Sequence, residues 1–185
     1  MYIDRFLNNL QQLNEEYRVN IVESVEPSGR RIFKGERSKI KHFPFMATIQ
    51  FFNNFHCAGS IIKSDLIITA SSCFAWNNRF FRENPAFLTA RVGSSFYNSG
   101  GEVIPILEIY FHPLYDPKTL RNNICILRLT RQLKFRRKSK KVKKIDIDRS
   151  EAALALNTHG ITVVGWGARE VYNPIKPSIV LSDSL

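Results

Sequence analysis

The chain has 185 residues, of which 44% are hydrophobic and 12% aromatic, and it carries a formal net charge of +11. This composition excludes a low-complexity or disordered chain and supplies enough apolar surface for one sizeable core. No apolar run approaches the roughly 20 residues that a membrane-spanning helix needs, and the positive charge favours polyanions or acidic surfaces as partners.

The first part of the chain, residues 1–31, begins with a helical pattern. Its apolar residues recur at intervals of three and four, which predicts an amphipathic helix over about the first eighteen residues. The repeating residues are Ile3, Phe6, Leu7, Leu10, Leu13 and Tyr17. Pro27, Ser28 and Gly29 break the pattern. The segment carries early charges and no continuous apolar stretch, so it does not have the form of a signal peptide.

From Pro44 to Leu129 the sequence is a series of short apolar runs separated by turn residues. Each run is rich in β-branched and aromatic residues, which is typical of strands. Regular short strands with Gly, Asn and Pro between them predict an all-β fold, a small antiparallel barrel. The predicted strands are residues 45–52, 56–63, 66–70, 87–93, 102–111 and 124–129.

A basic run follows the last of these strands. Eight cationic side chains fall within eleven residues, and we call residues 134–144 the basic run. Its cationic members are Lys134, Arg136, Arg137, Lys138, Lys140, Lys141, Lys143 and Lys144. Such a run is either a solvated connector or a docking strip for anionic glycans, lipid head groups or nucleic acid. Nucleic acid is the weakest of these ligands, since Phe135 is the one aromatic residue in the run that bases would stack on.

Three cysteines, Cys57, Cys73 and Cys125, allow one disulfide and one free thiol. Cys125 lies in the apolar segment ICIL, where a cysteine packs as a small hydrophobic residue. The four histidines do not show His-x-x-x-His spacing, and the three cysteines do not show Cys-x-x-Cys spacing. We therefore expect no zinc site and no cofactor. These histidines are His42, His56, His112 and His159.

Several segments, taken in order, resemble the trypsin-like (chymotrypsin-fold) serine protease family. They are FHCAGSII around Cys57, DLIITASSC ending at Cys73, HPLYD at residues 112–116, NNICIL at residues 122–127 and ITVVGWG at residues 161–167. The resemblance covers Arg31 to about Leu185. It implies a first β-barrel that is complete and a second barrel that is only begun, so that the chain is C-terminally truncated relative to the family.

The resemblance also implies a disulfide between Cys57 and Cys73. A loop of this length contributes roughly 3 kcal/mol in the chain-entropy model. Such a bond belongs to an oxidising compartment, so we expect an extracellular, secreted protein. The sequence shows no signal peptide, for which a truncated N-terminus is one simple explanation.

Family landmarks divide the chain into four parts. Arg31 and Ile32 resemble the junction at which trypsin-like zymogens are cut, which makes residues 1–31 a pro-segment; the alternative is an exposed dibasic linker. Residues 32–133 then form the first barrel, residues 134–157 a basic connector between barrels, and residues 158–185 the start of the second barrel.

The catalytic positions of the family are altered in this sequence. Ser72 stands where the family pattern Ala-Ala-His-Cys has the catalytic histidine, and Asn123 stands where the family has the aspartate. A serine hydroxyl does not accept and hold a proton near neutral pH, and a neutral amide does not stabilise an imidazolium. The string Gly-Asp-Ser-Gly-Gly, which carries the family's nucleophile, does not occur in the sequence.

We therefore expect no intact catalytic residue, and three functions remain open. The first is a catalytically inactive protease homologue that acts as an extracellular binding or regulatory module for protein partners. The second is a fragment of a trypsin-like serine endopeptidase that hydrolyses peptide bonds. The third is a polyanion-binding protein that uses the basic run to bind ligands such as anionic glycans.

Overall fold

The computed structural model describes residues 36–147, 162–167 and 180–183. These residues all belong to one compact unit of the chain, Arg31–Leu185. The predicted helix in the first eighteen residues, the junction at Arg31 and Ile32, and His159 lie outside the described residues. The elements are β1 (Glu36–Arg37), β2 (Met46–Phe51), β3 (Asn54–Lys63), β4 (Leu66–Thr69), η1 (Ser71–Asn77), α2 (Asn78–Glu83), η2 (Pro85–Phe87), β5 (Leu88–Val92), β6 (Glu102–Phe111), β7 (Cys125–Leu129), β8 (Thr162–Gly165) and β9 (Val180–Asp183).

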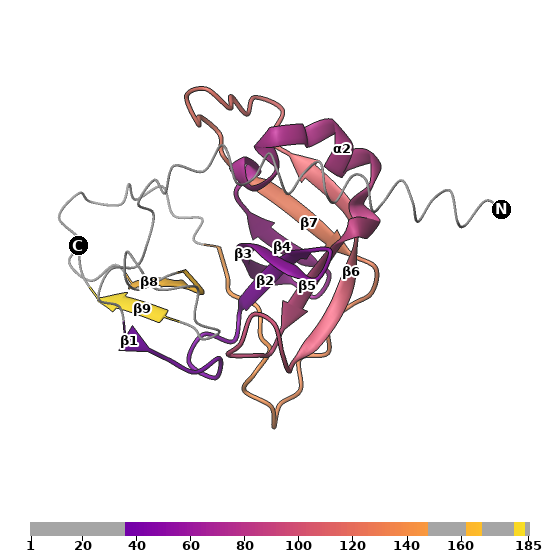
Figure 1. Cartoon of the computed structure of the whole chain (residues 1–185). Helices are drawn as coiled ribbons and strands as arrows, with labels where there is room; N and C mark the ends of the chain where they lie inside the picture. Colours follow the sequence, from indigo (N-terminus) through magenta and orange to yellow (C-terminus); the bar gives the residue numbers. More distant parts are fainter. Residues whose placement is uncertain (1–35, 148–161, 168–179, 184–185) are drawn as a thin grey trace. The chain divides into compact units, whose positions relative to one another are not determined.

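Within the described ranges, six strands close into an antiparallel barrel in the order β2-β3-β4-β7-β6-β5 (Figure 1). The barrel closes because β2 pairs with β3 along one edge and with β5 along the other. Every strand predicted between residues 45 and 129 is present, with its ends within about two residues of the prediction. The all-β class and the complete first barrel are therefore confirmed.

The barrel interior is filled by the inward side of each strand. In β5 the residues alternate between buried and half-buried, with Leu88, Ala90 and Val92 fully buried. This period of two is what a strand with one face on a core requires. Gln50, on the opposite side of β2, is also buried, and its amide nitrogen donates to the carbonyl oxygen of Tyr97 at 3.0 Å. A buried amide needs such a partner to offset the loss of water.

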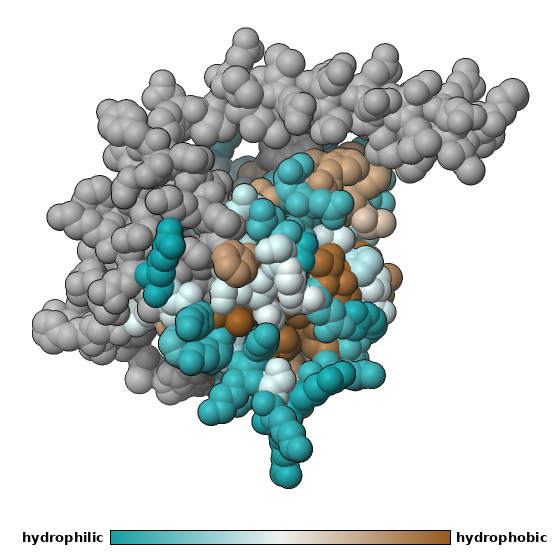
Figure 2. Space-filling model, turned by 60° about the horizontal axis from the view of Figure 1, so that its bottom comes forward, coloured by the Kyte–Doolittle hydropathy of each residue, from teal (hydrophilic) through white to brown (hydrophobic). Residues whose placement is uncertain are grey.

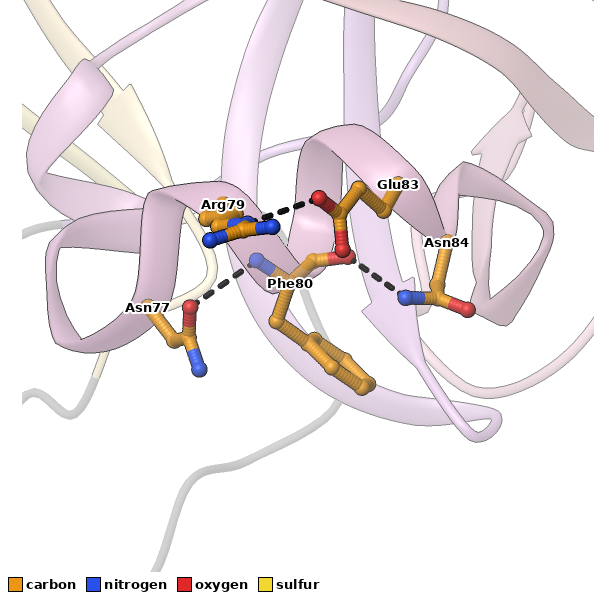
Figure 3. A network of polar contacts seen from close by, with 5 residues as sticks. All are labelled: Asn77, Arg79, Phe80, Glu83 and Asn84. Carbon is orange, nitrogen blue, oxygen red and sulfur yellow. Dashed lines mark hydrogen bonds and ion pairs between the residues drawn. The ribbon is translucent and has the colours of Figure 1, made fainter.

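A short helical segment, which the strand pattern did not predict, joins β4 to β5. It consists of η1, α2 and η2. Figure 3 shows how α2 is capped: the side-chain oxygen of Asn77 accepts from the backbone N–H of Phe80 at 2.9 Å, and the Asn84 amide donates to the Phe80 carbonyl at 3.0 Å. Arg79 and Glu83 form an exposed ion pair one turn apart. Phe74 and Phe81 from this segment are fully buried in the core.

A smaller cluster of buried side chains lies outside the barrel interior. Met46 and Ile40 pack there with Trp166, which directly follows β8. The Trp166 indole is 1% exposed and donates to the carbonyl oxygen of Ser95 at 3.1 Å. Strand β8 itself belongs to a three-stranded sheet with the order β1-β9-β8. Trp166 of the Gly-Trp-Gly segment therefore contacts Ile40 and Met46, at the entry to β2, and Ser95, which follows β5.

We expect the Trp166→Ala variant to lose about 3–5 kcal/mol of unfolding free energy, because it removes a large buried side chain and its hydrogen bond. Urea unfolding followed by far-UV circular dichroism measures this loss without relying on tryptophan fluorescence. Val163 in β8 is 45% exposed, so Val163→Ala serves as the control and should change stability by about 0.5 kcal/mol or less. Equal losses in the two variants would contradict the docking of Trp166.

Candidate active site

Ser72 and Asn123 meet because their strands are neighbours in the barrel. Ser72 lies in η1, which follows the end of β4, and Asn123 precedes the start of β7. Strands β4 and β7 pair antiparallel, with Thr69 opposite Cys125. Because the end of one antiparallel strand lies beside the start of its partner, the residues that continue from both strands share one rim of the barrel.

These two residues are joined by a reciprocal pair of hydrogen bonds. The backbone N–H of Ser72 donates to Oδ1 of Asn123 at 2.7 Å, and Nδ2 of Asn123 donates to the hydroxyl oxygen of Ser72 at 3.0 Å. A backbone N–H can only donate, so the Asn123 atom that faces the Ser72 N–H must be the amide oxygen. The amide nitrogen then faces the Ser72 hydroxyl and donates to it. The two positions that the family resemblance assigned to a base and its aspartate are thus in direct contact.

The adjoining residues hold this pair in place. The hydroxyl of Ser71, which is fully buried, donates to the carbonyl oxygen of Ile124 at 2.6 Å. On the other side of Ser72, Cys73 forms the predicted disulfide with Cys57 of β3, with a Cα–Cα distance of 6.2 Å. The Ser72–Asn123 contact is therefore fixed by a side-chain hydrogen bond to Ile124, the residue before β7, and by a disulfide to β3.

The contact contains neither a general base nor a carboxylate. The serine hydroxyl and the asparagine amide are both neutral groups, and each satisfies the other by hydrogen bonding. Proton abstraction at neutral pH requires a group that titrates near that pH. The arrangement is suited to bracing the turn after β4.

His56 lies close to the Ser72–Asn123 contact, because it is hydrogen-bonded to Cys73, the residue after Ser72. Its Nε2 lies 2.6 Å from the carbonyl oxygen of Cys73 and donates to it. The ring packs against Phe74 and Phe81, with each pair of ring centroids 5.7 Å apart. Burial lowers the pKa of His56, although the bond to the Cys73 carbonyl partly raises it again. A neutral, donating ring beside the disulfide is a structural tie between β3 and η1.

The other described histidines are engaged elsewhere. His42 Nδ1 lies 3.1 Å from the hydroxyl of Ser38, and His112 Nδ1 accepts from the backbone N–H of Leu114 at 3.1 Å. Cys125 is 1% exposed, and burial raises the pKa of its thiol to about 12, so it packs as a small hydrophobic residue. Among the residues that the structure describes, no three His, Cys, Asp or Glu side chains gather in a way that would hold a metal ion.

The basic run is attached to the barrel at both ends. The backbone N–H of Leu133 donates to Ser64 O at 2.6 Å, and that of Lys143 donates to Pro44 O at 2.9 Å. Leu133 is buried, and Val142 packs against the core. Figure 1 draws the segment in orange beneath the barrel. Because its ends are bonded to the barrel, the run has a defined path and is not a loose connector.

The cationic side chains of the run remain in solvent. All eight are exposed, and Figure 2, which looks onto this end of the molecule, shows hydrophilic side chains projecting from it. Within the described residues, Lys144 is the one member of the run that forms an ion pair, with Asp146. With respect to the residues that the structure describes, the other seven therefore present uncompensated positive charge to solvent.

A closed antiparallel barrel of six strands, with a disulfide from β3 to the turn after β4, defines a trypsin-like β-barrel protein. A family model described as trypsin matches residues 32–182. The chain is 31% identical over 155 residues to trypsin epsilon of Drosophila erecta, covering 84% of this chain and 56% of that relative. It is 33% identical over 137 residues to trypsin alpha-4 of Lucilia cuprina, covering 74% and 49%. The chain belongs to the trypsin family.

Two solved structures show the same fold at lower identity. A scabies mite inactivated protease paralogue superposes with a TM-score of 0.70 at 22% identity, covering 82% of this chain and 60% of that one. Human heparin binding protein superposes with a TM-score of 0.68 at 21% identity, covering 82% and 64%. The chain spans about half the length of the curated relatives it matches. Over the residues described, no helix combines the length and the apolar character needed to cross a membrane.

We expect the stability of the protein to fall as the pH is lowered below about 6.5, the pKa of an ordinary histidine. The pKa of His56 is lowered in the folded state, so between its folded pKa and 6.5 the unfolded chain binds the proton more readily and unfolding is favoured. This contribution is fully present above pH 6.5 and is lost on acidification towards the folded pKa. Urea unfolding between pH 7.5 and 5.5 measures it.

The His56→Gln variant is the control, since an amide keeps a donor for the Cys73 carbonyl but does not titrate. Its unfolding free energy should change less over this pH range than that of the unaltered protein. Parallel curves for the two proteins would show that His56 does not titrate as its burial predicts.

Proposed function

We propose that this trypsin-family domain does not hydrolyse peptide bonds and acts as an extracellular binding or regulatory module. The observation that carries the proposal is the reciprocal hydrogen bonding of Ser72 and Asn123. In the trypsin-like mechanism these positions would hold a base and the carboxylate that orients it. Here two neutral groups bind each other in their place.

The expected loss of activity is large. Changing the aspartate of such a triad to asparagine lowers turnover by about 10⁴, and removing the base lowers it by about 10⁶ in a related protease. Both positions lie inside the part of the chain that matches the family. The alternative, an active endopeptidase of which this sequence is a fragment, therefore has to explain how residues 72 and 123 support catalysis.

The remaining features are consistent with a secreted member of the family. The Cys57–Cys73 disulfide suits an oxidising compartment. The trypsin family match begins at residue 32, which supports cleavage between Arg31 and Ile32 and a pro-segment over residues 1–31. The same division would make residues 32–133 the first barrel, residues 134–157 the connector, and residues 158–185 the beginning of a second barrel.

After cleavage between Arg31 and Ile32, we expect the chain to release no product from arginyl or aromatic reporter peptides above the rate in buffer. The physical reason is that no imidazole stands at position 72 to take a proton from a nucleophile. Continuous fluorescence of the released reporter group measures the rate. Turnover at a rate ordinary for proteases, about 1 per second or faster, would overturn the proposal.

A double variant, Ser72→His with Asn123→Asp, tests whether the two positions correspond to the base and the aspartate. The introduced imidazole should have a higher pKa, followed by NMR, beside Asp at position 123 than beside the native Asn, since a carboxylate favours the protonated ring. The single variant Ser72→His is the matched control. If both imidazoles have the same pKa, the correspondence fails even when the hydrolysis result stands.

A second function, polyanion binding through the basic run, is favoured by a separate observation. Seven of its cationic side chains are exposed and lack an ion-pair partner among the described residues, and the backbone that carries them is bonded to the barrel. Concentrated positive charge on a fixed backbone attracts polyanions and limits the ordering cost of binding them. Human heparin binding protein has the same barrel fold, so the fold itself is compatible with such a ligand.

We expect a variant with four run cations changed to Gln to elute from a heparin column at clearly lower salt than the unaltered chain. The four are Lys134, Arg136, Lys141 and Lys143, and the slope of log affinity against log salt should fall by about three to four if each contacts the polyanion. The control changes the same number and kinds of exposed cations elsewhere: Lys39, Lys41, Lys118 and Arg121. Equal shifts in both variants would mean that net charge, and not the run, retains the protein.

A further inference from the structure

We propose that the basic run and the adjoining end of the barrel form a cationic pocket that binds one sulfate ester group of a sulfated polysaccharide. The inference rests on the second function proposed above, polyanion binding, and it names the specific site. It differs from attraction by an exposed strip because it requires particular side chains around a hollow and not merely their summed charge.

The structure contains a cavity of about 350 Å³ between the basic run and the neighbouring ends of β5 and β6. Its lining includes Arg131, Lys134, Arg136 and Lys141, together with Glu102 at the start of β6. The other cations of the run, among them Arg137, Lys138 and Lys140, do not line it. The cations of the run therefore form two groups, those that line the hollow and those outside its lining, which we call the rim cations.

The charges that line the cavity do not cancel. Glu102 is its one lining carboxylate, and it forms an ion pair with Arg131 at 2.5 Å. Within the described residues, Lys134, Arg136 and Lys141 have no ion-pair partner. Three cations around one small concave volume raise the local concentration of an anion more than the same charges spread over a flat surface. A sulfate ester, with its charge shared by several oxygens, accepts hydrogen bonds from all of them.

The hollow has a defined shape because the run packs closely against the end of β5. Gly93, which follows β5, has a φ of +73°, and a Cβ there would lie 2.9 Å from Cγ2 of Val142. The absence of a side chain at residue 93 lets Val142 pack against the core. The backbone bonds of Leu133 and Lys143 fix both ends of the run, and a turn from Arg136 to Ser139, with N···O at 3.2 Å, shapes its middle. Binding therefore does not have to order this segment first.

The volume and the lining select the ligand. About 350 Å³ is at the small end of the range for ligand pockets, about 300–1,000 Å³, so the pocket takes one sulfated sugar unit, and the rest of the chain would pass over the rim cations. Nucleic acid would need aromatic platforms for its bases, but Phe135 lines a different cavity, with Ile62 and Ile147. The pocket lining is hydrophilic apart from Val92, the two glycines and Val142, and it offers no exposed apolar wedge for a lipid bilayer.

Two variants of the full chain that lose the same charge separate the pocket from the strip. The pocket variant carries Lys134→Gln, Arg136→Gln and Lys141→Gln, and the rim variant carries Arg137→Gln, Lys138→Gln and Lys140→Gln. Both lose two lysines and one arginine. Isothermal titration with a fully sulfated heparin tetrasaccharide in about 0.15 M NaCl gives the affinity. We expect the pocket variant to bind at least tenfold more weakly than the unaltered chain, and the rim variant at most threefold more weakly.

The possible outcomes distinguish this inference from the function on which it rests. Equal losses in the two variants would overturn the pocket and leave polyanion binding in place, whereas no loss in either would overturn both. Thermal melting of both variants checks their folding, and the single variant Lys134→Gln, expected to lose at least threefold, repeats the test with minimal change. A pocket-dependent affinity for phosphatidylserine vesicles or for a 20-nucleotide thymidine oligomer that matches the tetrasaccharide would also overturn the assignment to a sulfated polysaccharide.

Discussion

The pairing of β4 with β7 is the constraint on which the rest of this structure depends. These strands are distant in sequence, yet their register places Thr69 opposite Cys125 and so brings Ser72 and Asn123 to one rim of the barrel. The same ladder completes the closed barrel whose interior forms the main core. In an antiparallel barrel, residues that follow one strand and precede its neighbour meet whatever their chemistry. The fold therefore brings residues 72 and 123 into contact at this rim, and their side-chain chemistry determines what the contact can do.

In this chain the residue types make the contact a brace. A histidine–aspartate couple would carry charge at this position. Removing that charge from water costs free energy, which hydrogen bonds would have to offset. Ser72 and Asn123 exchange two hydrogen bonds without any ionised group, at 2.7 and 3.0 Å. The contact is supported by the Ser71 bond to Ile124 O and by the Cys57–Cys73 disulfide. With these two residue types the turn is well anchored, and the main barrel core contains neither residue.

Much of the barrel was predictable from sequence because its strands alternate and its turns carry Gly, Asn or Pro. The helical segment from Ser71 to Phe87 was not predicted, although Asn77 as an N-cap and the Arg79–Glu83 spacing are local signals for a short helix. Strand β9 pairs with β1 across most of the chain length, and such long-range pairing leaves little local trace. The family resemblance assigned Ser72 and Asn123 to the positions of the histidine and the aspartate, but the contact between them and its two hydrogen bonds are visible only in the structure.

The basic run shows how tertiary contacts change the meaning of a charge pattern. In the sequence it has the composition of a solvated connector, and composition alone does not separate a mobile tail from a shaped surface. The deciding residues are apolar or neutral: Leu133 and Val142 pack on the barrel, and Gly93 lets Val142 approach. They fix the backbone between them, and some cations of the run line a hollow while others lie outside its lining. Since a barrel presents its loops independently of catalysis, the proposed binding pocket at one end of the strands does not depend on what the Ser72–Asn123 contact does at the other end.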